Sequence, residues 1–366
     1  MKWKLFFMEM KMNKLPPPSS SENVCLGNST SVKKRIHWLD VSRGLAFLMV
    51  IYSHLEYSND AVMRYFTPVF LTSFFFVSGY LFKEKCSFSK VFEQRTRTLL
   101  LPFLALGMIM ILLSQVLTFN AKVPFMDAVK GLLFQNGTNQ LLWFVAALYV
   151  YSVIFYWVER FSRTAKKLLV ISFALFVLNW LYGKLQVPSI PWHIDTFGYA
   201  CFYMGVGKWY KEKEKSVNRY VDNKWLVLCC LIFYIILVTA FDLHIGFSGS
   251  TYLIDSIVVT IFGLIVMLYV SKHILVNSRF LLFVGANTLF YFAFHGKVYS
   301  LLQTLCHKFL SDAVLNNVGV HDMIAVGITL LDAVILILPA MFVNRYCGFL
   351  LGKGFKLWTQ RKMTYE

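Results

Sequence analysis

The sequence predicts an all-α integral membrane protein, a bundle of about ten transmembrane helices with both termini in the cytoplasm. Three observations predict it: the composition, the length of the apolar runs and the one-sided distribution of the cations. The 366 residues are 57% hydrophobic and only 15% charged, whereas soluble domains carry roughly 25% charged residues. A water-facing surface would need more charge than this chain has.

The apolar residues are gathered into runs of roughly 17–25 residues with little fixed charge, the length that crosses a bilayer as a helix. A β-barrel would require alternation of polar and apolar residues, which these runs lack. The weakest run contains Asp195 and three glycines, and with the run before it could form one re-entrant unit. The predicted spans are 38–58, 66–82, 99–118, 140–158, 168–183, 194–210, 225–243, 251–270, 280–303 and 324–343.

The cations determine the predicted orientation. Of the 36 Lys and Arg, 29 lie in the two tails and in the even-numbered connections between spans. This asymmetry is typical of cytoplasmic segments and places both termini in the cytoplasm. A net charge of +17 could also indicate nucleic-acid binding, but the topology accounts for it. The lipid bilayer is therefore an expected partner, and nucleic acid is not.

Three segments are expected along the chain. Residues 1–35 are basic and polar with a Pro16-Pro17-Pro18 run, which is typical of a disordered cytoplasmic tail. Residues 36–350 form the membrane domain, and 351–366 form a cytoplasmic C-terminal tail. The seven cysteines are scattered without a Cys-x-x-Cys pair, so no metal site is predicted.

The first span carries ionisable residues, which are costly in a membrane and indicate a functional interior. Arg43 and His54 are eleven residues apart, so on a helix they lie within about 20° of one face and about 16 Å apart along the axis. Asp40, three residues before Arg43, can pair with its guanidinium. His54 is suited to take a proton from a hydroxyl, and Arg43 to bind a phosphate or carboxylate. The alternative is a snorkelling arginine and a hydrogen-bonded interior histidine.

Two further arginines, Arg95 and Arg97, lie in a predicted cytoplasmic loop just before the third span. Arginines separated by one residue can form a cradle for a phosphorylated ligand. On their own they are better explained as a topology signal. The sequence alone leaves both interpretations open.

Four ionisable residues in later spans are weaker candidates. His295 lies at a depth in the ninth span similar to that of His54 in the first. The two could form an acid–base pair, although a satisfied interior histidine is the alternative. Asp195 could bind acceptor hydroxyls or cap a helix start. Asp255 and Asp332 lie within the eighth and tenth spans and could pair with cations from other spans.

These residues resemble a known family, the acyltransferase-3 family of membrane acyltransferases. The Arg43-to-His54 spacing within WLDVSRGLAFLMVIYSHL carries the resemblance first. It continues through FFFVSGYLF at 74–82, Arg95-Thr96-Arg97, LLWFVAAL at 141–148, HIDTFGYACFYMGVGK at 193–208 and NTLFYFAFHG at 287–296. The sugar O-acetyltransferase branch, which includes fucose 4-O-acetylase-like proteins, is the most similar in character.

The resemblance implies transfer of an acetyl group from cytoplasmic acetyl-CoA to a hydroxyl of a glycan or lipid-linked sugar, with no bound cofactor. It makes His54 the catalytic histidine, Arg43 its partner, and Arg95 and Arg97 the residues that handle the CoA donor. It also favours a bacterial inner membrane. The alternative class is a polytopic transporter or flippase, but no inverted repeat is evident and the Arg43/His54 pattern has no counterpart in the second half.

Overall fold

The computed structural model describes residues 35–83, 86–117, 123–134, 142–185, 190–240, 253–311, 314 and 317–353. Within these residues the regular structure is helical, and no strand occurs. The predicted tails lie outside the described residues, apart from Arg35 at one end and residues 351–353 at the other. Each predicted span overlaps one helix or two consecutive helices.

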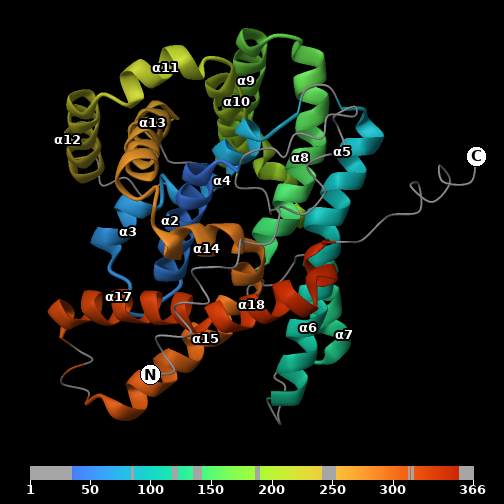
Figure 1. The fold of residues 1–366 in the computed structure, drawn as a ribbon, viewed down its shortest axis with the longest axis vertical. Helices are drawn as coiled ribbons and strands as arrows, with labels where there is room; N and C mark the ends of the chain where they lie inside the picture. Colours follow the sequence, from blue (N-terminus) through green and yellow to red (C-terminus); the bar gives the residue numbers. More distant parts are fainter. Residues whose placement is uncertain are drawn as a thin grey trace, which may run out of the picture.

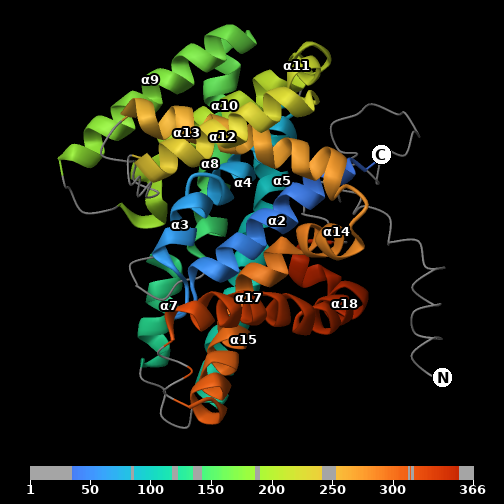
Figure 2. The same ribbon diagram turned by 90° about the vertical axis from the view of Figure 1, so that its left-hand side faces the viewer.

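The elements along the chain are these, with Figures 1 and 2 showing their arrangement. The first half contains α2 His37–Ser53, α3 Asp60–Phe66, α4 Phe70–Tyr80, α5 Phe88–Arg95, η2 Thr96–Leu100, α6 Leu101–Leu117, α7 Phe125–Phe134, α8 Trp143–Ser162 and α9 Ala165–Lys184. The second half contains η3 Pro191–Thr196, α10 Phe197–Glu212, α11 Glu214–Val221, α12 Lys224–Ala240, α13 Leu253–Tyr269, η4 Val270–Ile274, α14 Arg279–Ala286, α15 Thr288–Phe309, α17 Val318–Ile335, α18 Ile337–Tyr346 and η5 Gly348–Leu351.

By length and composition, six helical segments of the described chain can cross a membrane, or seven if the bent pair α11 and α12 counts as one span. The six are Asp60–Tyr80, Phe88–Val116, Trp143–Ser162, Ala165–Lys184, Ile257–Ile274 and Gly319–Tyr346. Two of the predicted spans, α2 and α10, are only 17 and 16 residues long and have most of their residues buried. The number ten and the cytoplasmic termini therefore stay predictions.

The periphery of the molecule is apolar, as a bilayer requires. Helix α9 lies at the edge in both views (Figures 1 and 2), and only 22% of its span is buried in the protein. Its Val170 and Leu178 are 68% and 60% exposed. Large apolar side chains that face outward over a whole helix are stable in lipid and costly in water.

The centre of the fold is α2, which lies between α4 and α14 (Figures 1 and 2). Its contact with α14 has no room for side chains: a methyl group at Gly285 would lie 1.7 Å from the carbonyl oxygen of Asp40, and one at Gly44 would lie 2.4 Å from that of Leu281. Pairs of small residues allow such close approach of membrane helices. The first span is thus an interior helix of the described structure.

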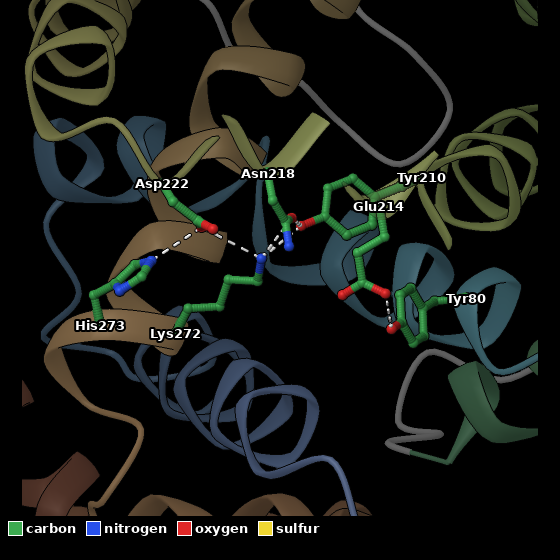
Figure 3. Close-up of polar contacts among 7 residues, drawn as sticks. All are labelled: Tyr80, Tyr210, Glu214, Asn218, Asp222, Lys272 and His273. Carbon is green, nitrogen blue, oxygen red and sulfur yellow. Dashed lines mark hydrogen bonds and ion pairs between the residues drawn. The ribbon is translucent and has the colours of Figure 1, made fainter. Parts of the chain in front are cut away.

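A polar network holds the end of the bundle where α2 begins, the end that the sequence predicts to face the cytoplasm (Figure 3). Lys272 of η4 donates to Tyr210 and Asn218 at 2.8 Å each and pairs with Asp222 at 3.4 Å. Its ammonium group also lies 5.5 Å from the centre of the Trp38 ring in the first turn of α2. Because the polar partners of Lys272 are complete, we assign this network a structural role.

Candidate active site

Two histidines from distant parts of the sequence meet at the far end of α2. His54 forms the C-cap of α2, where its backbone N–H bonds to the carbonyls of Ile51 and Tyr52, and its side chain is exposed. His295 of α15 is fully buried. The two ring centroids are 5.7 Å apart, and the ring of Tyr299 stacks on that of His54 at 6.4 Å. The similar depth expected from the sequence is therefore an actual contact.

The surroundings of His295 determine which of its nitrogens carries a hydrogen. Its Nδ1 lies 2.9 Å from the backbone carbonyl oxygen of Tyr291. A carbonyl oxygen can only accept, so Nδ1 is the donor and Nε2 of the neutral ring is an acceptor. The rings of Phe47 and Phe292 stand edge-on to it, with centroids at 5.3 and 6.4 Å. These contacts hold the imidazole in one orientation.

Arg43 lies near the other end of α2 and does not meet His54. Its guanidinium pairs with Asp40 at 2.7 Å, as the three-residue spacing predicted. The second carboxylate oxygen of Asp40 pairs with Arg35. The Asp40 side chain is 5% exposed and that of Arg43 is 29% exposed. One buried carboxylate thus orients two arginines and leaves a net positive charge.

The C-terminal turn adds a cation that the sequence did not single out. Lys353 donates to the side-chain oxygen of Asn344, and the side-chain nitrogen of Asn344 donates to the side-chain oxygen of Asn287 at the end of α14. Burial, and then the nearby Arg35 guanidinium, lowers the pKa of Lys353. In the sequence Lys353 belongs to a segment that reads as a tail, so nothing there indicated that it would pack beside Arg35.

The same turn reaches Arg97. Gly352 has a φ of 70°, and a methyl group on it would lie 2.1 Å from the Arg97 carbonyl oxygen. Arg97 is buried at 7% exposure within the π-helical turn η2. A series of neighbouring contacts thus links four cationic residues at the predicted cytoplasmic end. Arg43 and Arg35 share Asp40, Arg35 acts on Lys353, and Gly352 beside Lys353 approaches the backbone of Arg97. We call Arg43, Arg35, Lys353 and Arg97 the cationic group. Arg95 is half-buried and lines a separate small cavity with Phe82 and Gln94.

The remaining predicted residues have different places. Asp195 accepts a hydrogen bond at 2.9 Å from the backbone N–H of Ile190, the residue before η3, and its role in acceptor binding stays a prediction. Asp332 is fully buried in α17. The side chain of Asp255 lies outside the described residues. Tyr299, four residues after His295, was missed, although the spacing placed both on one helix face.

Apolar helices of spanning length, an interior first helix and a pair of histidines at its end define a helical membrane protein with a polar candidate site. The family model described as an acyltransferase domain, acyltransferase-3, matches residues 36–343. The chain therefore belongs to the acyltransferase-3 family and is an acyltransferase. A search of curated proteins and a search of solved structures each find no match.

Proposed function

We propose that this protein transfers an acetyl group from cytoplasmic acetyl-CoA to a hydroxyl of a glycan or lipid-linked sugar, in a bacterial inner membrane. The observation that carries the proposal is the two-ended arrangement of α2. The cationic group with Arg43 lies near one end of this buried helix, and His54 lies with His295 at the other. Phosphates bind best to arginine clusters, and hydroxyl deprotonation needs a base.

The donor would bind by its phosphates at the predicted cytoplasmic end. Arg35 and Arg43 are oriented by Asp40 and present their remaining N–H groups. Lys353 adds a third positive charge next to Arg35. Charge-assisted bonds to phosphate are about twice as strong as neutral ones. The thioester arm of the donor would then extend along α2 toward His54.

The acceptor would approach from the exposed side of His54. The loop that follows His54 contributes Glu56 and Tyr57. The hydroxyl of Tyr57 and the carboxylate of Glu56 each lie 3.2 Å from Nε2 of His307. The side chains of His307 and Glu56 are 50% and 61% exposed. The exposed Glu56 carboxylate and His307 imidazole, with the buried Tyr57 ring behind them, suit the hydroxyl groups and ring faces of a sugar.

The transfer requires one proton to move from the acceptor hydroxyl to His54 and then to the leaving CoA thiolate. His54 takes the proton of the acceptor hydroxyl as the oxygen attacks the thioester carbonyl carbon. The new C–O bond forms, the C–S bond breaks, and the CoA thiolate leaves. His54 then returns the proton to that thiolate, so that the products are the acetyl ester and CoA.

The experiment that tests this function measures CoA release. Purified protein in proteoliposomes receives acetyl-CoA with or without p-nitrophenyl hexosides as acceptors, and free thiol and acetylated glycoside are quantified together. We expect acceptor-dependent CoA release with one ester formed for each thiol. A transporter or flippase would release no CoA, and that result would contradict the proposal.

Arg95 supplies a separate prediction about the donor. CoA carries a 3′-phosphate apart from its pyrophosphate, and we propose that one of the two binds at the cavity lined by Arg95 while the other binds at the cationic group. Arg95→Gln should then raise the KM for acetyl-CoA by about tenfold with little change in kcat, because loss of an arginine–phosphate bond costs binding. Lys166→Gln is the matched control, since Lys166 is an exposed cation at the start of α9. Equal KM changes in both variants would mean that only the general charge of this face matters.

A further inference from the structure

Two buried polar groups, one on α15 and one on α17, have no hydrogen-bond partner among the described residues; these two helices contact each other and α2, and we call the region where the three meet the compartment. They are the carboxyl of Asp332, through both oxygens, and Nε2 of His295. Both side chains are fully buried. Unsatisfied buried polar atoms are rare because each costs about 1–3 kcal/mol. Such a pair in one compartment therefore calls for a functional explanation.

Contacts of α17 bring Asp332 near the face of α15 that carries His295. Tyr291, His295 and Tyr299 follow one face of α15 at four-residue intervals. The hydroxyl of Tyr291 donates at 2.8 Å to the carbonyl of Ala333, the residue after Asp332. The Asp332 carboxyl lies within electrostatic range of the phenols of both Tyr291 and Tyr299. His295 is the residue midway between them.

The helical period of α17 indicates which face Asp332 occupies. Ala325 belongs to the same buried cluster as Tyr52 and Leu55, the residues on either side of His54 at the end of α2. Asp332 is seven residues further on, so it lies on the same face of α17, about two turns or about 10 Å along the helix. That face of α17 is turned toward α2, which it contacts. Figures 1 and 2 show α17 beside α15 and below α2.

The hydrogen-bonding needs of the two groups are complementary. Nε2 of His295 is an acceptor, since Nδ1 donates to the Tyr291 carbonyl. No basic side chain pairs with Asp332 among the described residues, and an isolated buried carboxylate is so costly that the group neutralises instead. A neutral carboxyl carries one O–H donor. Asp332 can therefore supply the donor that Nε2 of His295 needs.

We propose that Asp332 is a positioning residue that acts, as a neutral acid, on His295 through one bridging water. The hydrogen bond keeps the His295 imidazole neutral and its ring fixed against His54. A water with several polar partners is nearly as favourable as a direct bond. The catalytic part of this inference rests on the proposed function; the hydrogen bond itself does not.

The ionisable groups around this compartment come from three elements and the loop after α2. Next to the pair lie His54 of the α2 C-cap and Tyr291 and Tyr299 of α15. Further out are Glu56 and Tyr57 of the loop, His307 of α15 and Asp322 of α17, and these have partners of their own. The position of Asp332 is thus separate from the outer polar cluster.

The kinetic test compares a neutral donor with an apolar side chain at this position. Asp332→Asn keeps an N–H donor and should retain kcat to within about threefold, whereas Asp332→Leu should lower kcat about tenfold with an unchanged KM for acetyl-CoA. Thr329→Val is the control on the same helix, because the Thr329 hydroxyl donates to the backbone carbonyl of Ala325, one turn earlier in α17. The Thr329→Val variant should retain kcat. Equal losses in Asn and Leu would overturn the neutral-donor role, as would full activity of Asp332→Leu.

A second measurement does not depend on acyl transfer. Nitrogen NMR of full-length protein with 15N-labelled histidine, in nanodiscs, reads the tautomer of His295, whose signals are assigned by their loss in His295→Gln. We expect a protonated Nδ1 and a hydrogen-bonded, unprotonated Nε2 in the wild type and in Asp332→Asn, and a shifted Nε2 signal in Asp332→Leu. An imidazolium at His295, or an Nε2 signal that is the same in the wild type and in Asp332→Leu, would refute the inference. This result can be read even if the protein does not transfer acetyl groups.

Discussion

His54→Ala should lower acetyl transfer by about 10²–10⁴-fold, the contribution expected of a general base in a proton-transfer step. The reason is local: His54 is the exposed member of the histidine pair, and the Tyr299 ring stacks on it. Because the donor phosphates would bind at the other end of α2, the KM for acetyl-CoA should change little. The effect should therefore appear in kcat.

The control for this prediction is on the same helix. His37→Ala removes an exposed histidine from the first residue of α2 and should leave kcat unchanged. His54→Gln keeps a polar side chain of similar length without a basic nitrogen, and it should be as inactive as alanine. Initial rates of ester formation in proteoliposomes measure all three. If His54→Ala keeps more than a tenth of the wild-type kcat, another group is the base.

Gly285→Val should have the largest effect on the folded protein itself. Even a methyl group at this position would lie 1.7 Å from the Asp40 carbonyl oxygen and 3.0 Å from the Gly44 backbone nitrogen. Backbone atoms cannot rotate away, so α2 and α14 must separate. Overpacking a tight contact typically costs about 1–3 kcal/mol for added methylenes. Here the cost should exceed that range, because Asp40 and its arginine partners move as well.

A conservative pair of variants makes this measurable. Gly285→Ala should lower the Tm of the detergent-solubilised protein and reduce its monodisperse fraction. Gly327→Ala, on α17, introduces the same methyl group where no heavy atom lies within 4 Å, and alanine is the better helix former by about 1 kcal/mol. Its Tm should be equal or higher. Equal Tm values for the two alanine variants would show that the α2–α14 contact is looser than described.

Local patterns in the sequence correctly predicted those features that depend on a single helix. The Asp40–Arg43 ion pair follows from a three-residue spacing, and the structure confirms it. The predicted spans all overlap helices, because long apolar runs in lipid have few alternatives to the α-helix. Asp195 shows the limit: its residue type suited a ligand or a cap, and the sequence did not indicate its contact with the backbone N–H of Ile190.

Contacts between helices were beyond such reasoning. His54 and His295 share a depth in their spans, but equal depth does not bring two helices side by side. Lys353 reads as part of a basic tail, and its place beside Arg35 depends on the turn at Gly352. Asp332 was recognised as costly in a membrane, but its place near Tyr291 follows from the Tyr291–Ala333 bond between α15 and α17.

The sequence by itself determined that this chain is a helical membrane protein of the acyltransferase-3 family, that its cations cluster in a few segments between apolar runs, and that Arg43 and His54 belong to one helical segment. Hydropathy, charge and residue spacing are properties of single segments, so they can be read along the chain. The tertiary structure decided that α2 is interior, that His295 lies beside His54, and that Lys353 comes within electrostatic range of Arg35. Those results depend on which helix faces meet, and close glycine contacts and a few interhelical hydrogen bonds choose among many similar apolar faces.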